Sequence, residues 1–268
     1  MKADIIVPTF ENTELTLRCF ESVRRHTDGY NLVWVDNGSS AESRSAVMSE
    51  IVRHPHHRTL WFRENIGFIK ANNVALRLVV QLWNTPTSHV VLLNNDVEVT
   101  HGWLDRLVKV ASAEPRVGVV GPVTSECKSW QSFEHVHEVI DMFQVPDDFV
   151  ERDTEGRARR LAYCYGELFR KCNMVAFFCA LVHKDVFRAV GYLDEVYDVG
   201  LGDDDDLCKR ATDVGFSCVI SLGTYVRHAH RQTFKNLYSD GDLARMKANR
   251  HQVFFDKHGE KATVHEVH

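Results

Sequence analysis

The chain has 268 residues, of which 44% are hydrophobic and 26% are charged, a composition typical of a globular protein and not of a disordered one. Its formal net charge of -5 excludes the general positive field on which many nucleic-acid-binding domains rely. The seven cysteines form no close pair with zinc-ribbon spacing, so we expect a reducing compartment. The apolar run before Pro8 is only three residues long and no apolar run is long enough to span a membrane, which favours a cytoplasmic protein without an integral membrane segment.

Apolar, β-branched runs alternate with segments of helical periodicity through the first half of the chain. Strands are expected at Ile5–Val7, Leu32–Val35, Thr59–Phe62 and Val90–Leu93, and helices after Asn12, from Ser40 to about Arg53, and from Asn65 to about Trp83. After a less regular stretch, the pattern resumes with apolar Val175–Val182, a helix Lys184–Val190, a helix from about Asp205 to Val214 and a strand Cys218–Ser221. This order predicts an α/β fold with a mostly parallel central sheet flanked by helices.

We find no internal repeat and no low-complexity linker, so one domain over residues 1–235 is the simplest account, followed by a polar helical tail over 236–268. Within it, residues 124–172 interrupt the alternation and are expected to form an acceptor-side insertion. Arginines in this insertion, including Arg157, Arg159 and Arg170, are suited either to an anionic acceptor or membrane surface or, more simply, to a loop neutralised by its own acids. A peripheral association with the inner membrane face is therefore the second localisation we consider.

Two carboxylates, Asp36 and Asp96, directly follow predicted buried strands. In open parallel sheets, ligands bind beyond the carboxyl ends of the strands, so both side chains are expected at one crevice. Leu92–Asp96 ends in Asn94, Asn95 and Asp96, a set of oxygen-bearing side chains that suits either a divalent cation or an ordinary turn.

Four adjacent carboxylates, Asp203–Asp206, lie between a glycine-containing loop and a predicted helix. Neighbouring acids raise one another's pKa, which helps to make a general base, while a helix N-terminus stabilises their charge. A solvated acidic helix start is the simpler interpretation, but Leu207 and Ala211 give this helix a buried face. Two histidines, His228 and His230, follow in an extended segment, and His228 bears on the site only if it meets Asp96 in space.

Taken in order, these segments resemble family 2 glycosyltransferases of the GT-A fold, especially a rhamnosyltransferase-like branch. The matching segments are Ile6–Phe10, Val35–Ser39, Asn65–Phe68 with Asn72-Asn73, Leu93–Val97, Gly191–Glu195, Asp203–Cys208, and His228 with Thr233-Phe234. The resemblance spans roughly residues 5–234, and its strength comes from seven weak motifs in the same order.

The resemblance implies roles for individual residues. Pro8, Thr9 and Glu11 would line the nucleotide pocket, and Asp36 would form a hydrogen bond with the nucleobase of the donor. Asn65, Gly67, Asn73, Asn94 and Asn95 would shape the donor site, with Asp96 and His228 as ligands of Mn²⁺ or Mg²⁺. His230 is the alternative histidine. The catalytic pair would be Asp203 and Asp204, with Asp204 as the base and Asp205 as the alternative if the alignment is shifted by one residue.

The implied reaction is an inverting transfer of a sugar from a UDP-, dTDP- or GDP-linked donor to an acceptor hydroxyl on a glycan, a lipid-linked glycan or another molecule. Two other functions stay open from the residues. A nucleotidyltransferase of similar fold would normally carry a glycine-rich, basic phosphate loop, and Val7–Glu11 is not one. A binding module that has lost turnover is disfavoured by the intact acid run.

Overall fold

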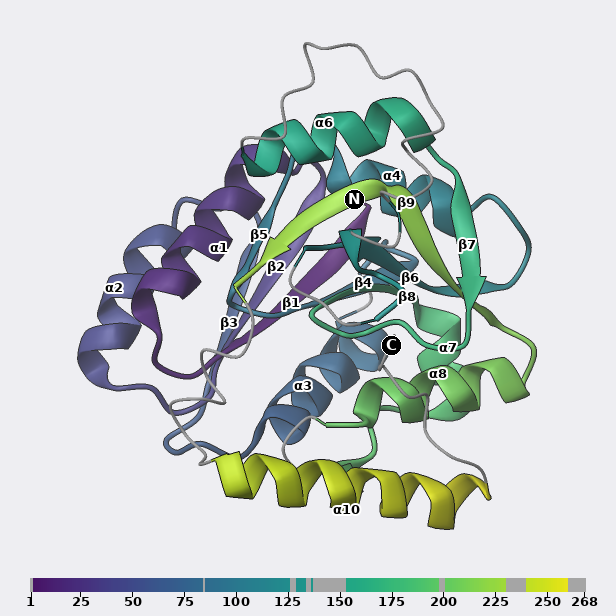
Figure 1. The fold of residues 1–268 in the computed structure, drawn as a ribbon. Helices are drawn as coiled ribbons and strands as arrows, with labels where there is room; N and C mark the ends of the chain where they lie inside the picture. Colours follow the sequence, from purple (N-terminus) through teal and green to yellow (C-terminus); the bar gives the residue numbers. More distant parts are fainter. Residues whose placement is uncertain are drawn as a thin grey trace.

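The structure is a computed structural model that describes residues 2–83, 85–125, 129–133, 136, 153–197, 201–229 and 240–259. Its sheet has the strand order β3-β2-β1-β4-β8-β6-β9-β5, and β7 pairs with β9 at the side of this path (Figure 1). The strands are β1 (Ala3–Thr9), β2 (Tyr30–Asp36), β3 (His57–Trp61), β4 (His89–Leu93), β5 (Val97–Val99), β6 (Val117–Val123), β7 (Phe169–Cys172), β8 (Cys179–His183) and β9 (Ser217–His228). The expected α/β fold in a single domain is confirmed.

Strand direction explains where the site forms. The described strands β1, β2, β3, β4, β6 and β9 run in one direction, while β5, β7 and β8 run in the opposite one. The carboxyl ends of β1, β2 and β4 therefore lie at the same edge, because β1 pairs in parallel with both of its neighbours. This edge carries the residues that follow Thr9, Asp36 and Leu93.

Helices cover both faces of the sheet because successive side chains of a strand point to opposite faces, and the central strands β1, β4 and β6 are buried at every position. One face packs on α1 (Thr13–His26), α2 (Ala41–Ile51) and α4 (Trp103–Ala111). The other packs on α3 (Phe68–Arg77), α7 (Lys184–Val190) and α8 (Asp203–Asp213). A third cluster joins α6 (Thr154–Tyr165) to β6 and β9, and α6 lies at the end of the molecule opposite α10 (Asp240–His258) in Figure 1.

Several elements differ from the sequence expectations. The predicted helix from Asn65 to about Trp83 begins at Phe68 and changes after Arg77 into the π-helical segment η1 (Leu78–Leu82). The apolar run that begins at Val175 becomes strand only over β8, since Val175 and the residues after it pack in the core before the strand starts. Strand β9 continues well beyond Ser221, and β5 was not expected.

The segment expected to interrupt the fold contributes a strand to the sheet. Residues 126–128, 134–135 and 137–152 lie outside the described residues, and α6 and β7 lie toward the end of the segment. Strand β7 pairs with the first half of β9, so the end of the expected insertion is part of the central architecture. The role of this segment on the acceptor side stays a prediction.

None of the described helices has the length and apolar character that a membrane crossing requires.

Candidate active site

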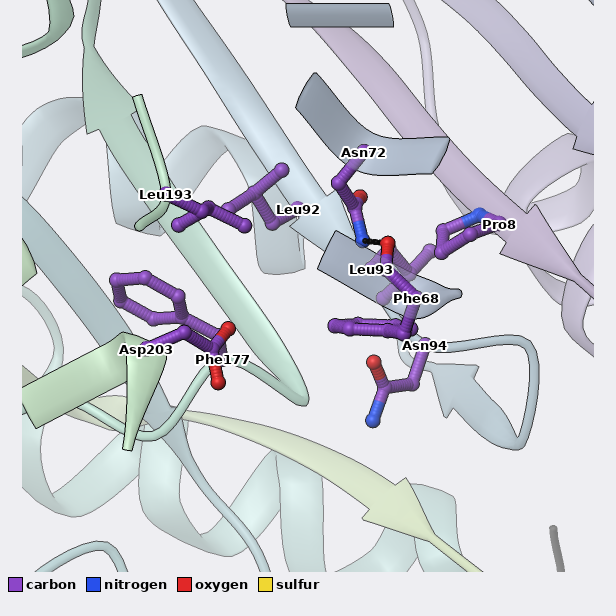
Figure 2. Close-up of a pocket in the computed structure, with 9 residues that line it drawn as sticks. All are labelled: Pro8, Phe68, Asn72, Leu92, Leu93, Asn94, Phe177, Leu193 and Asp203. Carbon is purple, nitrogen blue, oxygen red and sulfur yellow. Dashed lines mark hydrogen bonds between the residues drawn. The ribbon is translucent and has the colours of Figure 1, made fainter. Parts of the chain in front are cut away.

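A pocket lies at the carboxyl edge of β1 and β4, beside the start of α8 (Figure 2). Its lining combines apolar side chains with three polar ones, and consists of Pro8, Phe68, Asn72, Leu92, Leu93, Asn94, Phe177, Leu193 and Asp203. The expected residues Pro8, Asn94 and Asp203 are thus brought together from segments far apart in the sequence. Figure 2 shows the carboxylate of Asp203 on the side of the pocket that faces Asn94.

The end of β1 is fixed to the end of β2. The Trp34 indole Nε1 donates to the Thr9 hydroxyl at 2.9 Å, and the Asn37 amide donates to the Thr9 carbonyl at 2.8 Å. Thr9 is only 4% exposed, so its hydroxyl serves the packing of the two strand ends. Of the last two residues of β1, Pro8 lines the pocket and Thr9 does not.

Glu11 lies in the loop after β1 and has a left-handed backbone with φ of 51°. Its carboxylate accepts from the Ser40 amide at 2.7 Å and from the Ser40 hydroxyl at 3.1 Å, and its own amide donates to the Ser39 hydroxyl. Glu11 therefore ties the first loop to the N-terminus of α2, where negative charge is favourable.

Asp36 is fully buried at the end of β2. Arg44 Nε of α2 donates to its Oδ2 at 2.5 Å, and the Ser39 amide donates to its Oδ1 at 3.2 Å. The same guanidinium lies 5.7 Å from the ring centroid of Trp61, which is 61% exposed at the end of β3. The structure thus places Asp36 beneath Arg44, and the guanidinium and the indole form the accessible surface here.

Asn65 and Gly67 form the loop between β3 and α3. Asn65 Oδ1 accepts from the Asn37 side chain at 2.8 Å and from the Gly67 amide at 2.9 Å, while Asn37 Oδ1 accepts from the Ile66 amide. A Cβ on Gly38 would lie 2.3 Å from the Glu64 carbonyl carbon, so only glycine permits this loop to lie against the end of β2. The two loops form one rigid wall beside Asp36.

The neighbouring amides of α3 have different positions. Asn73 donates to the Leu193 carbonyl at 2.9 Å and to Glu195 at 3.2 Å, and its oxygen accepts from the Leu193 amide at 3.1 Å. These bonds use the amide to join α3 to the segment Gly191–Glu195. Asn72, and not Asn73, lines the pocket, with its nitrogen bonded to the Phe68 carbonyl at 3.0 Å.

The end of β4 presents its three polar residues in different directions. Asn94 lines the pocket, and its main-chain amide donates to the Phe178 carbonyl at 2.9 Å. The Asn95 side chain donates to the Thr16 hydroxyl of α1 at 2.9 Å, which turns it toward the helix. Asp96 faces His228.

Asp96 Oδ1 and His228 Nε2 are 3.2 Å apart, although the residues are separated by more than half of the domain. Both side chains are about nine-tenths buried, and the imidazole stacks on Phe178 with ring centroids 4.9 Å apart. The backbone supports the contact because Val97 pairs with His228 in the β5–β9 ladder and the Ala229 amide donates to the Asp96 carbonyl at 2.9 Å. The sequence analysis gave His228 a part in the site only if it contacts Asp96, and the structure shows this contact. His230 lies outside the described residues.

The chemistry of this pair fits a divalent cation. A carboxylate oxygen suits Mg²⁺ or Mn²⁺, and a neutral imidazole nitrogen is a common ligand of first-row metals. Among the described residues, no group of three or more His, Cys, Asp or Glu side chains is arranged around a metal-sized space. Two protein ligands leave the remaining positions to phosphate oxygens and water, as is usual where a metal binds with a substrate diphosphate.

The four acids at the start of α8 divide into two pairs. Asp203 is 3% exposed and lines the pocket; burial and then the charge of Asp204 raise the pKa of the Asp203 carboxyl to about 8. Asp204 is half-buried, and its Oδ1 accepts from the Asp205 amide at 2.9 Å. These two residues are the ones expected to be catalytic.

The second pair points to α10. Asp205 accepts from Arg250 at 2.5 Å. Asp206 is fully buried and bonds His258 Nε2 at 2.8 Å and Lys257 at 2.7 Å, and Arg210 of its own helix at 2.8 Å. The alternative base, Asp205, is thus held on the side of the helix that faces α10.

The sequence of the chain matches the model of glycosyl transferase family 2 over residues 4–191, which is well over half of its length. The chain belongs to this family. Its match covers β1 to α7 and ends before the acid run of α8. A sequence comparison with curated proteins gives no match.

Solved structures of other proteins share the fold, and three of them are compared with this chain. The mannosyltransferase PcManGT from Pyrobaculum calidifontis, in complex with GDP-Man and Mn²⁺, superposes with a TM-score of 0.62 at 17% identity and covers 98% of this chain and 66% of its own. GalNAc-T7 with UDP, GalNAc and Mn²⁺ gives 0.60 at 12% identity, over 85% of this chain and 44% of that one. S. aureus TarS 1-349 gives 0.58 at 13%, over 97% and 74%. The chain therefore spans less than two thirds of the first two structures.

Sequence reasoning missed several residues of the site. Arg44 on α2 carries no motif, yet it covers Asp36. Phe177 and Phe178 lie in an apolar run that indicates only a buried segment, but one lines the pocket and the other stacks on His228. Asn72 belongs to the Asn72-Asn73 segment that resembles the family. Because the two asparagines are adjacent on one helix, the sequence alone could not show that Asn72 lines the pocket and Asn73 does not.

Proposed function

We propose that this family 2 glycosyltransferase transfers a sugar from a nucleotide-diphosphate donor to an acceptor hydroxyl with inversion, in a metal-dependent reaction. The observation that supports this most directly is the convergence of Asp203 and Asn94 on one pocket, together with the contact of His228 with Asp96, which lies two residues after Asn94. A direct displacement at the anomeric carbon needs a base for the acceptor hydroxyl and a cation for the departing diphosphate. The residues proposed for both roles are close in the chain to residues that line the pocket, because Asp204 follows Asp203 and Asp96 lies two residues after Asn94.

Asp204 is the proposed base. It is the accessible member of the two acids that do not pair with α10, and an ionised carboxylate can take the proton of an attacking hydroxyl. Asp203, buried in the pocket wall with a pKa raised to about 8, holds a proton near neutral pH and can donate a hydrogen bond to a sugar oxygen.

Asp96 and His228 are the proposed metal ligands. A bound divalent cation would stabilise the negative charge of the departing diphosphate. The imidazole favours Mn²⁺ over Mg²⁺, because Mg²⁺ prefers an all-oxygen shell. Two of the three structural neighbours were solved with Mn²⁺ and a nucleotide or nucleotide sugar, which supports the same choice.

The donor nucleotide is proposed to bind along the wall formed by the loops after β1, β2 and β3. Because Asp36 is buried beneath Arg44, the nucleobase of the donor would contact the guanidinium of Arg44 and the exposed Trp61 before it could reach the carboxylate of Asp36. UDP-, dTDP- and GDP-sugars are all candidate donors, and a hexosyl donor and the rhamnosyltransferase-like branch stay proposals. The acceptor is proposed to be a glycan, lipid-linked or free, approached by a cytoplasmic or peripheral protein.

The purified protein is to be incubated with a panel of nucleotide sugars and Mn²⁺ or Mg²⁺, and release of the nucleoside diphosphate measured with and without chelator. We expect release from one donor, lost on chelation and restored by Mn²⁺. Release of pyrophosphate from a nucleoside triphosphate and a sugar phosphate would instead establish the nucleotidyltransferase. Binding of a nucleotide sugar without any turnover would establish the inactive binding module.

A further inference from the structure

The start of α8 concentrates four negative charges, of which Asp205 and Asp206 are almost fully buried. A buried carboxylate without a partner costs several kcal/mol, so these two require compensation. Asp206 receives part of it from Arg210 on the same helix. Most of the remainder comes from α10, which lies beyond the residues that match the family model.

Helix α10 contacts the acid-rich region on both sides of the turn that precedes α8. Lys257 bonds Asp194 Oδ2 at 2.6 Å in the segment before the turn and Asp206 Oδ1 at 2.7 Å in the segment after it. His258 Nε2 adds a contact to Asp206 at 2.8 Å. Phe254, which is 4% exposed, packs against the His258 ring. The helix therefore spans the segment that carries the proposed base.

Arg250 contacts this turn as well as an acid. Its guanidinium bonds Asp205 at 2.5 Å, and only 13% of its side chain is exposed. A Cβ on Gly202, whose φ is 100°, would lie 2.8 Å from Arg250 Cγ and 3.0 Å from the Tyr197 ring. The aliphatic part of Arg250 thus packs on the residue before Asp203, while its charge binds the residue after Asp204.

We propose that Arg250 is a positioning residue, which fixes the first turn of α8 by holding Asp205 on the side of the helix that faces α10, and so keeps Asp203 in the pocket wall with Asp204 beside it. This inference rests on the proposed function of Asp204. It adds a role for α10 that neither the matched family segment nor the acid motif contains. Its electrostatic part is consistent with the lowering of the Asp203 pKa by Arg250, against the raising by burial, Asp204 and Asp205.

The test compares Arg250→Gln and Arg250→Lys with a control, Arg188→Gln, which removes an exposed arginine paired with Asp185 on α7. Amide hydrogen exchange is measured on the full chain without substrate. We expect Arg250→Gln to speed exchange in the first turn of α8 about tenfold or more, while Arg250→Lys and the control stay near wild type. Wild-type exchange in Arg250→Gln, or equally fast exchange in Arg250→Lys, would overturn the proposal.

The pH dependence of turnover separates positioning from a general loss of stability. With the donor found active, Arg250→Gln is expected to keep nucleotide affinity and to lose about tenfold in kcat. Its alkaline limb should shift to higher pH, because loss of the guanidinium raises the pKa of Asp203, which acts in its protonated form. An unshifted pH profile overturns the electrostatic role. Failure of the wild type to turn over any donor counts against the proposed function alone, because the exchange experiment needs no substrate. Should Arg250→Gln not fold, Lys257→Gln, which leaves Arg210 and His258 on Asp206, is expected to speed exchange at the same turn, and wild-type exchange there would overturn the proposal.

Discussion

Asp96 and His228 meet at 3.2 Å because two backbone pairings join the start of β5 to the end of β9. Val97 pairs with His228 in the ladder, and the Ala229 amide bonds the Asp96 carbonyl. The contact is thus fixed by the main chain as well as by the side chains. A pair held in this way needs little rearrangement to bind a cation, which favours affinity.

His228→Ala tests the metal assignment. Removing one of two protein ligands is expected to raise the Mn²⁺ concentration for half-maximal activity by at least about tenfold, equivalent to roughly 1.4 kcal/mol. His183→Ala is the control, since His183 is a partly exposed histidine at the end of β8 and contacts His89 and Asp185. A Mn²⁺ titration of turnover measures both variants. An unchanged Mn²⁺ requirement in His228→Ala would exclude this residue as a ligand.

Asp204→Asn and Asp203→Asn should have different effects. Asn at 204 cannot accept the acceptor proton, so kcat is expected to fall about 10²- to 10⁴-fold with nucleotide affinity unchanged. Asp203→Asn keeps a hydrogen-bond donor in the pocket, so its kcat is expected to fall much less than that of Asp204→Asn. Steady-state rates and calorimetric titration with the nucleoside diphosphate make the comparison. Near-wild-type turnover in Asp204→Asn would assign the base elsewhere.

Asp203 is expected to make stability depend on pH. Because its folded-state pKa of about 8 exceeds the ordinary aspartate pKa of 3.8, the folded protein binds the extra proton between these values. Its contribution to stability is therefore greatest at low pH and declines as pH rises through this interval. Asp203→Asn removes the decline, so its Tm should exceed that of wild type more at pH 8 than at pH 5. A constant difference in Tm across this range would show that Asp203 is ionised throughout.

Gly38→Ala and Gly191→Ala form a matched pair. Both glycines have positive φ, 87° and 83°, but a Cβ at Gly38 meets the Glu64 backbone, whereas at Gly191 nothing lies within 4 Å. Gly191→Ala should lower the free energy of unfolding by about 1–3 kcal/mol through backbone strain alone. Gly38→Ala should lose roughly 2 kcal/mol more through the clash and also weaken nucleotide binding, because Asn65 must move. Urea unfolding and nucleotide titration measure the two effects; equal losses in both variants would contradict the role of the clash.

The sequence predicted the first four strands because each is a short run rich in apolar or β-branched residues, and three of the four runs are followed at once by Pro8, Asp36 or Asn94. It did not predict β5, since Val97–Val99 is too short to show any period, or the length of β9, since Gly223 and Thr224 interrupt its apolar pattern. The acids at 203–206 were recognised as a group, but their division into two pairs depends on α10, which lies some fifty residues further along the chain. The Asp36–Arg44 pair was missed because an arginine on an exposed helix face carries no pattern.

The short ladder between β5 and β9 restricts how this chain can change in length. Successive residues of a strand point to opposite faces, so deleting or inserting one residue between Leu222 and His228 would turn the imidazole away from Asp96. Homologues that keep the pair should therefore keep the spacing from the β6–β9 pairing to this histidine. Changes in length are instead expected between Val123 and Thr154, where strand β6 has ended and α6 has not begun.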